Sequence, residues 1–137
     1  MFEKYGKSGA DSLQIQRLDH LVLTVNNIEN TCRFYQENLG MKVVRAQNGR
    51  VSLHFGQQKI NLHQKGHEFE PKAQYPTPGS ADLCFITEYP IAQLKSDFQK
   101  NGVKIVAGPV MRNGAEGKIY SLYVRDPDQN LVEIANY

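Results

Sequence analysis

Five side chains spread along the chain are of types that bind divalent metals: His20, Asn61, His63, Asp82 and Glu133. Imidazole nitrogens and carboxylate or amide oxygens are ligands that such ions accept from proteins. Glu133 lies within an otherwise apolar segment, where a carboxylate is costly unless a metal or an imidazole compensates for its burial. These residue types indicate a metal site, provided that the fold brings them together.

An internal repeat relates the two halves of the chain. His20-Leu21 aligns with Asp82-Leu83, and without a gap the run from Gly40 to Val44 aligns with the run from Gly102 to Val106. After small adjustments in the loops, the run from Lys59 to Leu62 aligns with the run from Leu131 to Ile134. Each half therefore has the same order of elements.

The first half predicts a strand, a helix and three further strands. β-branched and large aliphatic residues favour a strand over 17–25. Asn26 followed by Glu29 is typical of a capping box at the start of a helix, and Gly40 is a typical residue to end it. The remaining strands are predicted over 41–44, 50–55 and 59–63.

The second half repeats this order after an irregular, proline-containing connection over 64–80. Pro90 suits the first turn of a helix, and Asn101-Gly102 suits its end. Turn residues over 126–130 separate the last two strands. The strands of this half are predicted over 81–87, 103–106, 118–124 and 131–135.

Strand alternation predicts which side chains share a face, because residues two apart on a strand point the same way. The large apolar residues Leu21, Leu23 and Val25 are expected to face the helices, which leaves His20 on the opposite, concave face. By the repeat, Asp82 takes the position of His20, and Glu133 takes that of Asn61. All five donors are therefore predicted to lie on the concave face, on four strands related by a pseudo-twofold axis.

Further residues are predicted near this face. Cys84 is interpreted as a small apolar filler, with a reactive thiol as the alternative. Arg112 and Lys118 flank a glycine-containing segment over 114–117, which is predicted to be a mobile flap beside the cup where both residues would meet an anionic substrate. His54 and His67 are predicted to be surface residues.

Length and composition restrict the class of protein. A chain of 137 residues can form one compact domain or two small modules sharing a core. A net charge of +2, with the two signs interspersed, argues against a nucleic-acid binder that depends on a basic face. No apolar run approaches the ~20 residues that span a bilayer. We expect a soluble, cytoplasmic protein with a flexible arm over 1–12 and no membrane or nucleic-acid partner.

Three segments resemble the vicinal oxygen chelate superfamily of glyoxalase I, bleomycin- and fosfomycin-resistance proteins and extradiol dioxygenases: Leu18–Val25, Phe34–Gly40 and Asp126–Glu133. The resemblance implies an α+β fold of two tandem βαβββ modules, over 17–65 and 81–137 with a linker over 66–80. The modules would form a cup-shaped, mostly antiparallel sheet with the helices outside. The run from Asn61 to Ser80 is similar to small glyoxalase-domain proteins of the lactoylglutathione-lyase type.

The resemblance also assigns site residues. The first-strand histidine of the family falls on His20, and its last-strand glutamate falls on Glu133. Its central histidine falls on Asp82 and its remaining glutamate on Asn61, so this sequence departs from the family pattern at two positions. It implies a divalent metal (Ni, Zn, Co, Mn or Fe) on His20, Asp82 and Glu133, with His63 as a further donor.

The activity implied is that of a metal-dependent lyase or isomerase acting on a small α-oxo compound or its thiol adduct, with Glu133 as the base. The alternatives are a non-catalytic small-molecule or antibiotic-binding protein of the bleomycin-resistance type and an extradiol-dioxygenase-like enzyme. The resemblance further implies a homodimer with two sites. The long connection over 64–80 would permit the modules to exchange between chains.

Overall fold

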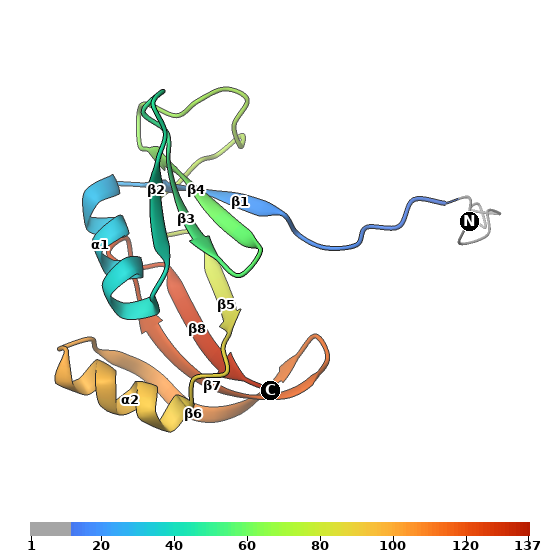
Figure 1. The fold of residues 1–137 in the computed structure, drawn as a ribbon, viewed down its shortest axis with the longest axis vertical. Helices are drawn as coiled ribbons and strands as arrows, with labels where there is room; N and C mark the ends of the chain where they lie inside the picture. The colour runs from blue at the N-terminus through green and yellow to red at the C-terminus, as the bar shows by residue number, and fades with distance from the viewer. Residues whose placement is uncertain (1–11) are drawn as a thin grey trace.

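The chain folds into two modules with the same order of elements (Figure 1). The computed structural model describes residues 12–137, so the predicted flexible arm lies outside the described residues except for Ser12. The first module comprises β1 (His20–Val25), α1 (Ile28–Leu39), β2 (Lys42–Arg45), β3 (Val51–Phe55) and β4 (Gln58–Gln64). The second comprises β5 (Asp82–Ile86), α2 (Ile91–Lys100), β6 (Ile105–Gly114), β7 (Gly117–Arg125) and β8 (Leu131–Asn136). The predicted α+β class with two βαβββ modules is confirmed.

Each module forms its own mixed, four-stranded sheet. The strand orders are β1-β4-β3-β2 and β5-β8-β7-β6, and in each the first strand pairs in parallel with the last while the other pairs are antiparallel. Val22 lies opposite Asn61 in the first sheet, and Cys84 lies opposite Glu133 in the second. These are corresponding positions, so the repeat read from the sequence extends to the register of the strands.

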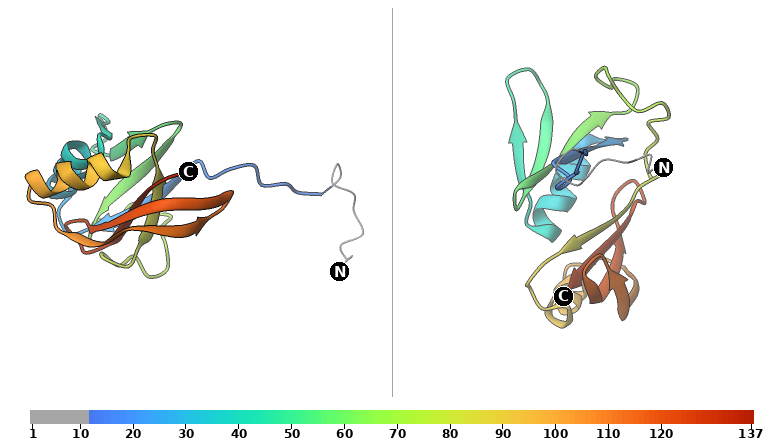
Figure 2. Two further views of the ribbon diagram at one scale, coloured as in Figure 1. Left: turned by 90° about the horizontal axis from the view of Figure 1, so that it is seen from below. Right: turned by 90° about the vertical axis from the view of Figure 1, so that its right-hand side faces the viewer.

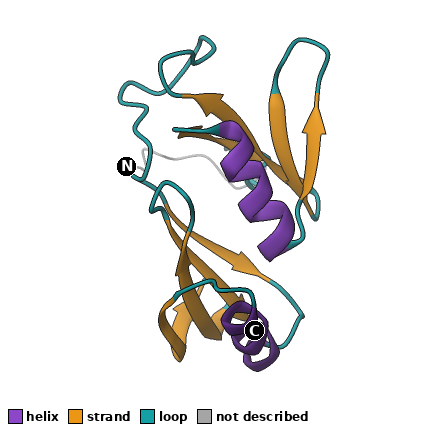
Figure 3. Ribbon diagram, turned by 90° about the vertical axis from the view of Figure 1, so that its left-hand side faces the viewer, coloured by secondary structure: helices purple, strands orange, loops and turns teal. Residues whose placement is uncertain are grey.

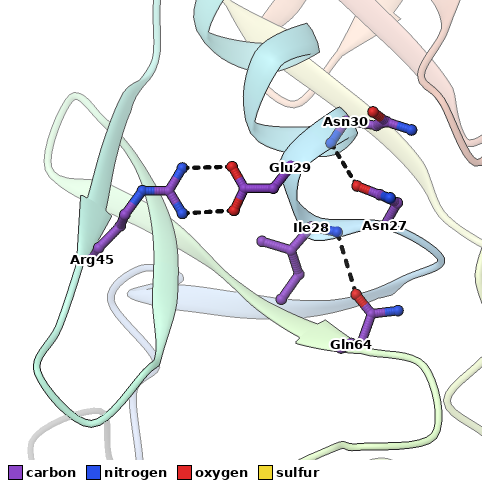
Figure 4. A network of polar contacts seen from close by, with 6 residues as sticks. All are labelled: Asn27, Ile28, Glu29, Asn30, Arg45 and Gln64. Atoms are coloured by element: carbon purple, nitrogen blue, oxygen red, sulfur yellow. Dashed lines mark hydrogen bonds and ion pairs between the residues drawn. The ribbon is translucent and has the colours of Figure 1, made fainter.

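The start of α1 differs from the predicted capping box. The N-cap is Asn27, whose side chain accepts a hydrogen bond of 2.9 Å from the backbone N–H of Asn30 (Figure 4). Glu29 forms a two-pronged ion pair with Arg45 of β2, at 2.8 and 2.9 Å. The prediction that Asn26 and Glu29 cap each other is therefore wrong. The predicted end of the helix is confirmed, since Gly40 adopts the left-handed conformation with φ of 66°.

The second module contains a longer hairpin than the sequence predicted. Strand β6 continues to Gly114, which pairs with Gly117 across a tight turn, so residues 114–117 form the tip of a β-hairpin and not an irregular loop. Two irregularities in the register lie on either side of Ala107 and hid the alternation of this strand. Gly108 is required there, because a Cβ atom would lie 2.4 Å from the carbonyl oxygen of Ser121.

A single apolar core joins the two modules. Each helix covers one face of its own sheet (Figure 3), and the buried core cluster contains residues of both modules. Phe85 of β5 packs edge-on against Tyr35 of α1 and Phe55 of β3, at ring-centroid distances of 6.5 and 5.3 Å. Within residues 12–137, no helix is long and apolar enough to cross a membrane.

The turn between β7 and β8 is bound to the first module by a buried carboxylate. Asp126 is only 2 % exposed and accepts a hydrogen bond of 2.7 Å from the hydroxyl of Tyr35. It also accepts hydrogen bonds from the backbone N–H groups of Asp128 and Asn130 and from the side-chain amide of Asn130. The burial of the Tyr35 hydroxyl, with Asp126 beside it, raises the pKa of this tyrosine.

Other contacts reach the same turn from both sides. The backbone N–H and the side-chain amide of Asn26 both donate to Asp128 Oδ1, at 3.1 and 2.8 Å. This use of Asn26 explains why it does not cap α1. The connection between the modules approaches so closely at Gly79 that a Cβ atom there would lie 2.4 Å from the carbonyl oxygen of Asp128. The turn therefore fixes how the two modules lie relative to each other.

We predict that Tyr35→Phe lowers the free energy of unfolding by about 1.5–3 kcal/mol, since it removes a buried hydrogen bond to a carboxylate. Tyr89→Phe is the matched control, because it removes an exposed hydroxyl that donates to Asp97. Its expected effect is below about 0.5 kcal/mol. Urea denaturation followed by circular dichroism measures both, and equal losses would contradict the role assigned to Tyr35.

Candidate functional site

Each sheet leaves the face opposite its helix open. In the first module this face carries His20 and Val22 of β1, Ser52 and His54 of β3, and Lys59, Asn61 and His63 of β4; we call it the first open face. In the second module it carries Asp82, Cys84 and Ile86 of β5, Tyr123 of β7 and Glu133 of β8; we call it the second open face. Val22 and Ile86 remain 45 and 52 % exposed. The predicted donors thus lie on two faces, three on the first and two on the second.

His20 begins β1 and is paired with the preceding residue. Its Nδ1 lies 2.8 Å from Asp19 Oδ2, and its side chain remains 44 % exposed. This hydrogen bond, more than any other contact, lowers the pKa of Asp19. An ionised carboxylate only accepts hydrogen bonds, so His20 donates from Nδ1 and its Nε2 is left with a free lone pair in the neutral ring.

Glu133 lies at the centre of the second open face. Cys84 is its partner on β5, and Tyr123 is its partner on β7. Burial and the adjacent Glu133 carboxylate raise the pKa of the Cys84 thiol to about 11. Cys84 is therefore a protonated thiol at neutral pH, which disfavours the reactive-thiol interpretation.

Tyr123 links Glu133 to Arg112. The Nε of Arg112 donates a hydrogen bond of 3.2 Å to the Tyr123 hydroxyl, and the guanidinium carbon lies 5.7 Å from the centre of its ring. Partial burial, with the Glu133 carboxylate contributing, raises the pKa of Tyr123, and Arg112 opposes this shift. Arg112 thus adjoins the second open face through Tyr123.

Asn61 and His63 line a hollow of about 340 Å³ on the first open face. Asn61 is partly exposed, whereas His63 is only 8 % exposed. The ring of His63 packs edge-on against Phe69 of the connection, with the ring centres 5.5 Å apart. Its Nδ1 is buried without a hydrogen-bond partner, and burial lowers its pKa.

The structure does not bring all the predicted ligands together in one chain. Among residues 12–137, no group of three or more His, Cys, Asp or Glu side chains is close enough to hold a metal ion. Asp82 and Glu133 lie on adjacent strands and face the same way, but His20 belongs to the other open face. The candidate site therefore consists of two half-sites.

A larger hollow, of about 500 Å³, lies elsewhere. It is lined mainly by apolar and aromatic side chains from both modules, including Leu39, Met41, Phe85, Leu94 and Phe98. None of the predicted site residues lines it. We therefore place the candidate site on the open faces, where the polar residues are.

Sequence reasoning missed four residues on or beside these faces: Arg50, His54, Lys59 and Tyr123. His54, predicted as a surface residue, is half-buried and bonded to Ser52 at 2.9 Å, and it lines the smaller hollow together with Arg50 and Lys59. Tyr123 was missed beside Glu133. The alternation rule that placed Asn61 would also have placed His54, because the hairpin register sets His54 opposite Lys59.

Comparisons with known proteins agree with this fold. The Salmonella typhimurium virulence protein STM3117 is 55 % identical over 134 residues, which cover 98 % of this chain and 93 % of that protein. Its crystal structure superposes with a TM-score of 0.89 at 58 % identity, covering 91 % of this chain and 99 % of that one. An integron cassette protein from V. cholerae also has a TM-score of 0.89, at 54 % identity over 92 % of this chain and 98 % of its own.

A fungal relative is similar over most of the chain. The glyoxalase domain-containing protein RDO1 of Mycosarcoma maydis is 54 % identical over 125 residues, covering 91 % of this chain and 70 % of that protein. The family model described as Glyoxalase/Bleomycin resistance protein/Dioxygenase superfamily matches residues 17–134. This chain, with its two βαβββ modules, is a member of that superfamily.

Proposed function

We propose that this protein is a metal-dependent lyase or isomerase of the glyoxalase type, acting on a small α-oxo compound or its thiol adduct. The observation that carries the proposal is the pairing of His20 Nδ1 with Asp19 at 2.8 Å. Metal-binding histidines commonly donate their second ring nitrogen to a carboxylate, which fixes the tautomer and the orientation of the ring. His20 has this arrangement, with Nε2 free to bind an ion.

The donor set fits a divalent cation. His20, Asp82 and Glu133 would hold Ni, Zn, Co, Mn or Fe through one imidazole and two carboxylates, a set that such ions accept. A bound ion supplies Lewis-acid polarisation of neighbouring substrate oxygens. Asp82 is exposed and Glu133 is partly exposed, so both carboxylates are accessible for this role.

Glu133 would act as the base that removes a proton from the carbon next to a carbonyl group. The Cys84 thiol and the Tyr123 hydroxyl adjoin Glu133 from the two neighbouring strands. Both groups are protonated at neutral pH because their pKa values are raised. They can therefore donate hydrogen bonds that position the carboxylate.

A complete site requires both half-sites, so we propose a homodimer in which His20 of one copy meets Asp82 and Glu133 of the second. Two structural features support this assembly. Strands β1 and β5 each pair on one side only and leave a free sheet edge next to the half-site. Residues 12–19 run away from the body of the protein (Figures 1 and 2).

Residues 12–19, which we call the arm from here on in place of the predicted arm over 1–12, expose apolar side chains. Leu13, Ile15 and Leu18 are 84, 79 and 58 % exposed. Its contact with the first sheet includes a hydrogen bond of 2.5 Å from the side chain of Gln58 to the Leu18 carbonyl. Burial of this apolar surface against a second copy would stabilise a dimer.

A second candidate is a non-catalytic small-molecule-binding protein. It is favoured by the hollow beside Asn61 and His63, which is lined entirely by residues of the first module and the connection. Thermal shift distinguishes the two candidates. Stabilisation by a divalent metal that is lost on chelation supports the enzyme, whereas indifference to metal supports the binding protein.

We predict that His20→Ala loses the metal carried by the purified wild-type protein, because it removes the imidazole ligand. His67→Ala is the matched control, since His67 is an exposed histidine of the connection. Metal content is measured by elemental analysis, with circular dichroism to verify folding. Wild-type metal content in His20→Ala would refute the site.

The activity is tested in the same samples. Hemithioacetal isomerisation is assayed after addition of nickel, cobalt, zinc or manganese, and Glu133→Gln should abolish turnover. An iron-loaded sample assayed with a catechol tests the extradiol-dioxygenase alternative.

We predict that Asp19→Asn weakens metal binding by about 10–100-fold while leaving the ligand set intact, because His20 loses the carboxylate that orients it. Asp97→Asn is the control, since Asp97 accepts hydrogen bonds on α2. Competition with a chromogenic chelator measures both affinities. An unchanged affinity in Asp19→Asn would remove the observation on which the proposal rests.

We predict that Leu13→Ser combined with Ile15→Ser weakens the dimer by at least about tenfold, since burial of one such side chain is worth about 1.5–3 kcal/mol. The polar residues that alternate with them supply the control, Gln14→Ser with Gln16→Ser. Light scattering across a dilution series measures the dissociation constant. A monomeric wild type, or equal effects of the two pairs, would contradict the role of the arm.

A further inference from the structure

We propose that the hollow on the first open face binds the anionic group, a carboxylate or a phosphate, of a small-molecule ligand. As a substrate subsite this proposal rests on the proposed function, but the binding of an anion requires neither a metal nor a second copy. The hollow, of about 340 Å³, lies over β2, β3 and β4. That volume is within the range of small-molecule sites.

The charge of the lining selects an anion. Arg50 and Lys59 supply two positive charges, and His54, Ser52, Asn48 and Asn61 add groups that can form hydrogen bonds. Among the described residues that line the hollow there is no aspartate or glutamate. Outside the lining, the Asp19 carboxylate, which is paired with His20, acts on Lys59, and the Glu68 carboxylate acts on His63.

Arg50 is held in position without a carboxylate. Its guanidinium carbon lies 4.2 Å from the centre of the Phe69 ring, a distance at which cation–π attraction orients the group. Within residues 12–137 it forms no ion pair. Arg45 of the same hairpin is the contrast, because Glu29 binds both of its terminal nitrogens on the helix side of the sheet. The donors of Arg50 are therefore available to a ligand.

His63 lies at the border of this hollow and of a second one, of about 440 Å³, beside the connection. It is 8 % exposed, and its Nδ1 has no hydrogen-bond partner. An unpaired polar atom at such a position is costly, and native proteins rarely leave one unsatisfied. Burial lowers the pKa of His63, and Arg50 acts in the same direction, whereas Glu68 opposes it.

The position of the hollow relates it to the half-site. Lys59 lies opposite His20, and Asn61 lies opposite the next outward residue of β1, Val22. An anionic group held by Arg50 and Lys59 would thus lie beside the strand that carries the metal-binding histidine. The remainder of the ligand would extend toward His20. The inferred substrate class is therefore a small oxo compound that also carries a carboxylate or a phosphate.

The test uses the full chain, stripped of metal with a chelator, and isothermal titration with malonate, inorganic phosphate and the neutral malonamide. We expect at least one anion to bind and malonamide not to bind. Arg50→Gln should raise the Kd about tenfold or more, the effect of losing hydrogen bonds to a charged group. Arg45→Gln, which removes a paired arginine from the same hairpin, should leave the Kd within about twofold.

Each outcome decides the proposal. Preference for malonate identifies a carboxylate ligand, and preference for phosphate identifies a phosphorylated one. Failure of both anions to bind, equal binding of malonamide, or equal effects of Arg50→Gln and Arg45→Gln would overturn it. Anion binding that persists in His20→Ala, while metal is absent from the wild type, would refute the metal-dependent function and leave this inference intact.

Discussion

The buried carboxylate of Asp126 is the interaction on which the relative placement of the two modules depends. It joins the β7–β8 turn to the helix of the other module through Tyr35 and shapes the turn itself through the backbone N–H groups that it accepts. The same turn binds Asn26 and leaves no room for a side chain at Gly79. Because an unpaired buried carboxylate would be costly, these contacts favour one arrangement of the modules. In that arrangement the helices and the aromatic contacts of Phe85 form a single core, while one face of each sheet stays open.

The two open faces differ in charge. The first carries histidines and Lys59 with Arg50 at its border, whereas the second carries Asp82 and Glu133, with Arg112 adjoining it through Tyr123. Oppositely charged faces attract each other, which would orient two copies so that each first open face meets the second open face of its partner. An anionic ligand would be repelled by the acidic face and held by the basic one. The same charge separation therefore serves both the proposed assembly and the proposed orientation of the substrate.

Much of the fold follows from the sequence, because alternation and repetition are local signals. Both predicted helices and all eight strands exist, and the register pairs Asn61 and Glu133 with corresponding residues.

The errors in the sequence-based predictions have tertiary causes. Asn26 satisfies the rule for an N-cap, but it binds Asp128 instead, 102 positions away. The hairpin of β6 was underestimated because a bulge near Gly108 breaks the alternation. Local sequence identifies Asp126 only as a turn residue, since no local pattern reveals its bond to Tyr35. No local pattern indicates Arg50 either, because its position depends on Phe69 of a connection without regular structure.

The two departures from the family pattern have a common electrostatic consequence. In that pattern each module contributes one histidine and one glutamate. Here Asn61 replaces a carboxylate on the first module, and Asp82 replaces a histidine on the second. Both changes move negative charge from the first open face to the second. Without a carboxylate at position 61, the positive charges of Arg50 and Lys59 remain unneutralised in the hollow that Asn61 helps to line. The pair of substitutions that departs from a glyoxalase ligand set is thus the same pair that would suit the first open face to an anion, which links the proposed ligand set to the proposed charge of the ligand.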